Sequence, residues 1–143
     1  HTNCIPVITN SIFWDNSATA GAQIYYYNTM APDVYYSVVQ GGWIGAGNID
    51  IDPLFADADG EDDTPGTADD DLHLLPWSPC IDAGDPAGDY SGQKDMDGQD
   101  RVLYDGVDMG ADEVFPIAGD VDEDGDVDLV DFTYFAGHWM KGK

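Results

Sequence analysis

Basic residues are scarce in this chain. Its 143 residues include 4 Lys and Arg against 29 Asp and Glu, which gives a formal net charge of −25 at pH 7. Nucleic-acid binding needs clustered Lys and Arg against phosphates, and anionic membrane surfaces attract the same residues. The composition therefore argues against nucleic acid as a partner, and against attachment to or insertion into a membrane.

Cysteine and long apolar runs are also rare. The two cysteines, Cys4 and Cys80, leave open one disulfide or two thiols. No apolar run has the length of a membrane span, and no signal peptide is recognisable. Hydrophobic residues at 43% and aromatic residues at 12% argue against a disordered chain. We therefore expect an ordered fold in which bound counter-ions offset the repulsion between carboxylates.

The Asp-rich stretch from Gly119 to Phe132 has the spacing of a twelve-residue calcium loop. Gly125 stands where such loops turn sharply, and Val127 stands where they make a short strand contact. The ligands would be Asp120, Asp122, Asp124, Asp126 through its carbonyl, Asp128 and Asp131. The alternative is a solvated acidic tail, but a tail does not require glycine and aspartates in this register.

An apolar helix is expected directly after this loop. Phe132, Phe135 and Trp139 recur at helical spacing and would form one apolar face. Together the loop and helix resemble one half of a type I dockerin, in which the twelfth ligand is aspartate and no helix precedes the loop. Dockerins carry this unit twice, whereas this chain has one copy. The resemblance implies Ca²⁺ as the ion and a cohesin-like or cell-surface partner.

Short β-rich segments separated by Asn and Gly turns fill the first third of the chain. They are Ile5–Thr9, Ser11–Trp14, Ala22–Tyr27, Asp33–Val39 and Asn48–Ile51. Their short length and the lack of Asn-Gly hairpin turns favour a parallel solenoid over a meander. We therefore predict an all-β fold, a right-handed parallel β-helix with an Asp/Gly-rich loop region and a C-terminal EF-hand-like loop plus helix.

Residues 8–116 resemble the last coils and closing tail of secreted bacterial β-helix proteins of the pectate-lyase-like kind. The resemblance is carried by ITNSIFWDN, AQIYYY, VYYSVVQGG, GNIDIDPLF and DLHLLPWSPCIDAGDP. It implies terminal β-helix coils and a closing tail over residues 1–116, followed by the dockerin-like unit over 117–143. It also implies a secreted, extracellular protein at the cell surface.

Two further acidic stretches are candidate calcium sites. The first offers Asp57, Asp59, Glu61, Asp63, Asp69 and Asp71 among turn-forming residues, with a solvated insertion as the alternative. The second places Asp95, Asp97 and Asp100 around Gly98, where an Asp-Gly turn with an Arg101 ion pair is an equal alternative. His73 is expected to be an exposed strand residue rather than a ligand.

No recognisable catalytic centre stands in the sequence. Lyases and hydrolases of the β-helix kind use basic residues, and the cations here are Lys94, Arg101, Lys141 and Lys143, outside the expected strands. We therefore expect a non-catalytic calcium-binding module for structure or assembly. An uncapped strand edge at Ile5–Thr9 favours a head-to-tail homopolymer or filament. The alternative is the C-terminal part of a carbohydrate-active enzyme, a polysaccharide lyase or hydrolase with a dockerin-type attachment segment.

Overall fold

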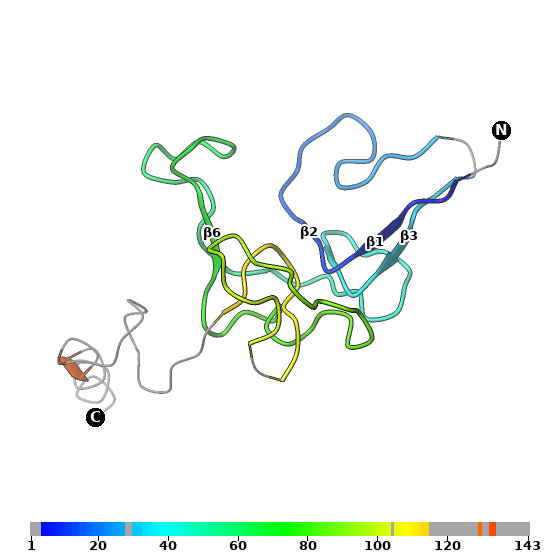
Figure 1. Cartoon of the computed structure of the whole chain (residues 1–143). Coiled ribbons are helices and arrows are strands. Elements are labelled where there is room, and N and C mark those ends of the chain that lie inside the picture. The colour runs from blue at the N-terminus through cyan, green and yellow to red at the C-terminus, as the bar shows by residue number, and fades with distance from the viewer. Residues whose placement is uncertain (1–3, 28–29, 104, 115–128, 130–131, 134–143) are drawn as a thin grey trace, which may run out of the picture.

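The computed structural model describes residues 4–27, 30–103, 105–114, 129, 132 and 133. Within them the chain forms six short strands joined by turns and bends (Figure 1). They are β1 (Val7–Thr9), β2 (Ile12–Phe13), β3 (Asp33–Tyr35), β4 (Val38–Val39), β5 (Phe55–Asp57) and β6 (Asp71–Leu74). They pair into three sheets of two strands each.

Two of these sheets are parallel and follow one another around a bend. β1 pairs with β3, and β2 pairs with β4. The bends fall at Asn10, with φ of 50°, and at Tyr36, with φ of 47°. The amide of Asn10 donates to the carbonyl of Tyr36 over 3.0 Å, so the two bends lie in register. Because left-handed backbone ends a strand, each strand stops after two or three residues.

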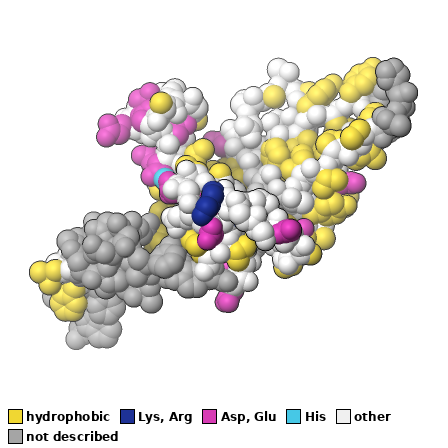
Figure 2. Space-filling view, in the orientation of Figure 1, with side chains coloured by type: hydrophobic (Ala, Val, Ile, Leu, Met, Phe, Trp, Pro, Cys, Tyr) yellow, Lys and Arg dark blue, Asp and Glu magenta, His cyan; other side chains and the backbone are white. Residues whose placement is uncertain are grey.

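The third sheet is antiparallel and carries the acidic loop. β5 pairs with β6, with Phe55 opposite Leu74 and Asp57 opposite Asp71. The residues between the two strands form a loop that projects from the body of the molecule (Figure 1). Asp and Glu side chains gather on this loop (Figure 2). The chain enters it through Gly60, where a Cβ would lie 2.8 Å from the backbone of Asp69, so glycine permits the close approach.

The predicted right-handed parallel β-helix is wrong for the described residues, which form no continuous solenoid sheet. Parallel pairing extends past the first two sheets only as an isolated bridge between Val38 and Ile49. Ala22–Tyr27 forms no strand. After a bend at Leu54, whose φ is 57°, the next pairing is antiparallel, because the loop between β5 and β6 reverses the chain. Short alternating segments suit a coil, but this reversal breaks the parallel stacking.

The small apolar core joins the strands to the turn-rich segment that follows them. Val38 of β4 and Leu74 of β6 pack with Cys80 and Met109, all nearly inaccessible to solvent. Both cysteines are free thiols, Cys80 buried and Cys4 exposed, so the disulfide left open by the sequence is not formed. The predicted boundary at residue 116 and most of the helix after the calcium loop lie outside the described residues.

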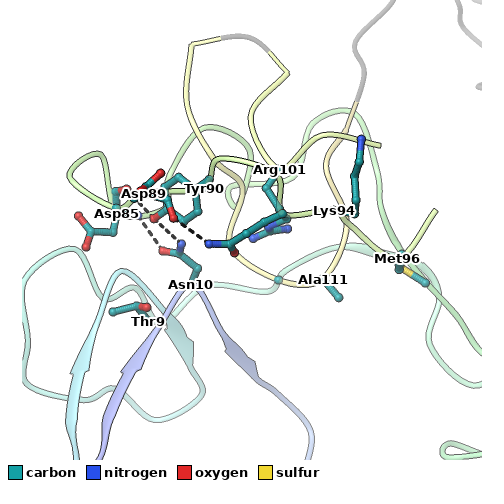
Figure 3. Close-up of a pocket in the computed structure, with 12 residues that line it drawn as sticks. Thr9, Asn10, Asp85, Asp89, Tyr90, Lys94, Met96, Arg101 and Ala111 are labelled. Atoms are coloured by element: carbon teal, nitrogen blue, oxygen red, sulfur yellow. Dashed lines mark hydrogen bonds between the residues drawn. The ribbon is translucent and has the colours of Figure 1, made fainter. Parts of the chain in front are cut away.

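Asn10 ties the parallel sheets to the turn-rich segment. Its Oδ1 accepts from the amide of Asp85 over 2.7 Å, and its Nδ2 donates to the Tyr90 hydroxyl over 2.8 Å. The Asn10 carbonyl also accepts from the amide of Gly110 over 3.0 Å. Figure 3 shows Asn10 pointing toward Asp85 and Tyr90 from the end of β1. The Asn10 side chain therefore binds Asp85 and Tyr90, which lie 75 and 80 residues further along the chain.

Replacing Asn10 by Gly should destabilise the protein by about 2 kcal/mol, because a partly buried amide and a hydroxyl each lose a partner. Glycine tolerates the positive φ, so the loss reports on the hydrogen bonds rather than on backbone strain. Urea unfolding measures the change, with Asn16→Ala as the control because Asn16 is exposed and, among the described residues, its side chain bonds to nearby Gln23. Equal stability of the two variants would contradict this role for Asn10.

Candidate functional site

One histidine and two aspartates from three segments meet beside β6. His73 lies in β6, Asp97 in the turn after Lys94, and Asp112 in the segment that follows Met109. Each of the three side chains offers an atom within 4.8 Å of the atoms offered by the other two. Imidazole nitrogens and carboxylate oxygens are common ligands of divalent metal ions. The group is therefore the candidate metal centre of the described residues.

The imidazole of His73 lies between two carboxylates. Its Nδ1 contacts Oδ1 of Asp71, and its Nε2 lies 2.9 Å from Oδ2 of Asp97. The hydrogen bond with Asp71 raises the pKa of His73, and that with Asp97 adds to the effect, while partial burial opposes both. The ring is consequently fixed in orientation, with Nε2 turned toward the other two members of the group.

Asp112 is almost completely buried, with 4% of its surface exposed. Its Oδ2 accepts from the amide of Leu74 over 2.9 Å, which joins the segment to β6. Desolvation raises the pKa of Asp112, since a buried carboxylate loses its hydration. The hydrogen bond from Leu74 and the charge of His73 act in the opposite direction.

More acidic groups lie next to the group of three. Asp95 accepts from the amides of Asp97 and Gln99 through Oδ1, at 3.0 and 2.7 Å, and so shapes the turn. Its Oδ2 is buried and has no hydrogen-bond partner among the described residues. Glu113, 2% exposed, pairs with Arg101 over 3.0 Å. Burial raises the pKa of Glu113 to about 7 in spite of this ion pair.

A polar cleft of about 560 Å³ lies on the other side of this turn, around Asn10 (Figure 3). Lys94 and Arg101 line it, together with Asp85, Asp89 and Tyr90. Both cations already have carboxylate partners, since Lys94 lies 2.6 Å from Asp100 and Arg101 pairs with Glu113. The cleft thus offers no unpaired cation for an acidic substrate.

The acidic loop brings some of its predicted ligands together. Partial desolvation, the charge of Asp59 and a hydrogen bond with it raise the pKa of Asp57, and Asp63 contributes a further repulsion. Asp59 and Asp63 thus both act on Asp57, and all three side chains are exposed. The Glu61 side chain is exposed, and the Glu61 amide is one of the donors that lower the pKa of Asp69. Asp69 accepts from Thr67 and from the amide of Asp62, and Asp71 faces His73 instead of the loop.

The third candidate stretch divides its aspartates among separate tasks. Asp97 joins the group of three, Asp95 shapes the turn, and Asp100 pairs with Lys94. The Arg101 ion pair expected within the turn is made with Glu113 instead. The calcium loop predicted at Asp120, Asp122, Asp124, Asp126, Asp128 and Asp131 lies outside the described residues.

Sequence reasoning missed the group of three as a unit. His73 was expected to be an exposed strand residue, yet it contacts two carboxylates with 41% of its side chain exposed. Asp97 and Asp112 are 24 and 39 residues further along the chain, with no motif linking them. Only the Asp71-x-His73 pair was visible in the sequence as a local signal.

Comparison with protein families, with curated proteins and with solved structures found no match to this chain. In the described residues, no helix has the length and hydropathy that crossing a membrane requires.

Stability without divalent ions should fall as the pH rises from 5 to 8. The ordinary pKa of Glu113, 4.5, is raised to about 7, so the folded state holds more protons than the unfolded state between these values. The stabilisation is complete below pH 4.5 and is lost by pH 7, and His73, whose pKa is also raised, acts in the same direction. We expect the Tm in chelator to be at least about 4 °C lower at pH 8 than at pH 5.

Glu113→Gln isolates the contribution of this carboxyl, because the amide oxygen can still accept from Asp108. The variant should show a smaller change in Tm between the two pH values, whereas Glu61→Gln, at an exposed position, should behave as the wild type. An unchanged pH profile in Glu113→Gln would show that another group is responsible.

Proposed function

We propose that this chain is a non-catalytic, extracellular calcium-binding module with a structural or assembly role. The observation that carries the proposal is the gathering of Asp and Glu side chains on the projecting loop of a chain with a net charge of −25 (Figure 2). Calcium binds six to eight oxygens and accepts flexible geometry, so closely spaced carboxylates in a loop suit it. The dockerin-like register at Asp120–Asp131 supports a second site of the same kind.

Two hydrogen bonds fold the acidic loop back on itself in a way that suits an ion-binding role. The amide of Thr64 donates to the carbonyl of Asp59 over 2.9 Å, and the amide of Asp62 donates to Oδ2 of Asp69 over 3.2 Å. These bonds hold carboxylates of like charge close together at the tip of a projecting loop. A divalent cation would remove this repulsion and add its binding free energy to the folded state. Extracellular calcium is millimolar, so weak sites would be filled.

Calcium at millimolar concentration should raise the Tm, and a chelator should reverse the effect. Calorimetric titration should count one ion fewer in the Asp59→Asn/Asp63→Asn variant and one ion fewer in Asp122→Asn, because each change removes ligands from one loop. Asp105→Asn, an exposed aspartate outside both loops, should bind as the wild type. A Tm independent of calcium would refute the proposal.

The assembly role is supported by exposed apolar side chains around β1. Ile5 and Val7 have 50% and 65% of their surface exposed, and Tyr25 and Tyr27 have 70% and 74%. β1 pairs with β3 along one edge, and no described strand pairs with its other edge. A second copy of the chain could pair with this edge and cover the apolar side chains, which is the reason for proposing a homopolymer.

Val7→Lys should reduce self-association in millimolar calcium, because a lysine on a strand edge opposes pairing with another chain. Analytical ultracentrifugation of wild type and variant over a range of protein concentrations provides the measurement. Val102→Lys is the matched control, since Val102 is 44% exposed and does not belong to β1. If the wild type stays monomeric at every protein concentration, self-assembly is excluded. The calcium-binding proposal would still stand.

A further inference from the structure

We propose that His73, Asp97 and Asp112 bind a divalent cation of the zinc class at a site separate from the calcium loops. Their ligand atoms, all within 4.8 Å of one another, come from β6, the turn after Lys94 and the segment after Met109. Ligands of one zinc ion lie about 2.0–2.2 Å from the metal, so small side-chain movements would bring these three onto one ion.

The chemistry of the ligands selects the class of ion. Calcium takes oxygen ligands almost exclusively, whereas a neutral imidazole suits zinc and its neighbours in the first transition series. One imidazole and two carboxylates resemble neither of the two acidic loops, which offer only oxygen. Three protein ligands leave coordination positions for water.

The surroundings of His73 already have the arrangement of a metal-ligating histidine. Such residues donate one ring N–H to a carboxylate, which fixes the tautomer and leaves the other nitrogen for the metal. In this chain Asp71 contacts Nδ1, and Nε2 faces Asp97 over 2.9 Å. An incoming cation would take the place of the proton between Nε2 and Asp97, and that proton would leave to solvent.

Buried acids beside the site are a second observation, independent of His73. Asp112 is 4% exposed. Among the described residues, Oδ2 of Asp95 is buried and has no hydrogen-bond partner. Arg101, the buried cation nearby, is engaged by Glu113 and by the carbonyl of Asp108. Buried carboxylates are normally paired or bound to metal, and here the acids exceed the cations.

A bound ion would cross-link three segments that are held together by few other bonds. The amide of Leu74 donates to Asp112 over 2.9 Å, and the amide of Met96 donates to the carbonyl of Ala111 over 3.0 Å. Metal ligation by His73, Asp97 and Asp112 would connect the same segments through side chains. The site would therefore stabilise the junction between the antiparallel sheet and the closing turns.

The experiment is a calorimetric titration of the whole chain with Zn²⁺ in buffer containing millimolar Ca²⁺, which fills the calcium loops first. Co²⁺ titration followed by visible absorption reports directly on nitrogen and oxygen ligation. The variants are His73→Gln and Asp97→Asn, whose side chains are 41% and 46% exposed and can change without disturbing the core. Asp100→Asn is the matched control in the same turn, where Asp100 pairs with Lys94.

We expect one Zn²⁺ per chain, with affinity at least about tenfold weaker in both variants and unchanged in Asp100→Asn. Asp71→Asn should also weaken binding, because Asp71 positions the ring without touching the metal. Absence of stoichiometric Zn²⁺ binding, or equal affinity in wild type and Asp97→Asn, would overturn the proposal. If His73→Gln fails to fold, as judged by circular dichroism, Asp97→Asn alone decides. A wild-type protein that binds no calcium would refute the proposed function but not the zinc-class site proposed here.

Discussion

Repulsion between carboxylates is the constraint on which the rest of this structure depends. With a net charge of −25, the folded chain must hold many like charges closer together than the unfolded chain does. The structure places one group of acids on a projecting loop and buries another next to a histidine and an arginine. In the buried group, desolvation raises the pKa of Asp108, Asp112 and Glu113, and repulsion from neighbouring aspartates adds to this effect.

Aspartates also provide much of the local structure. Their carboxylates repeatedly accept from the backbone amide two residues further on, as in Asp52, Asp71, Asp85, Asp89 and Asp95. In a sheet or helix these amides would donate to backbone carbonyl oxygens. Here the aspartate carboxylates take the place of those carbonyls. A chain with six short strands can therefore satisfy many backbone groups in turns. The same aspartates carry the negative charge. The residues that stabilise the turns are therefore also the residues that repel one another.

The local features of the chain were largely readable from its residues. The segments Val7–Thr9, Ile12–Phe13, Asp33–Tyr35 and Val38–Val39 lie within the stretches expected to be extended, because β-branched and aromatic residues favour strands. The predicted solenoid was wrong, because parallel pairing continues past β4 only as one isolated bridge and the loop between β5 and β6 then reverses the chain. A tyrosine or a leucine in left-handed backbone leaves no signal in the sequence, since tertiary contacts impose that conformation.

The sequence by itself determined the excess of carboxylates, the acidic stretches and the separate short strands, because these follow from residue type and near-neighbour spacing. Only the tertiary structure decided that Asp97 and Asp112 lie beside His73 and that Asn10 holds Asp85 and Tyr90. Contacts across 24 to 80 residues depend on where the turns direct the chain. No local pattern encodes that direction, since it results from the packing of all segments together.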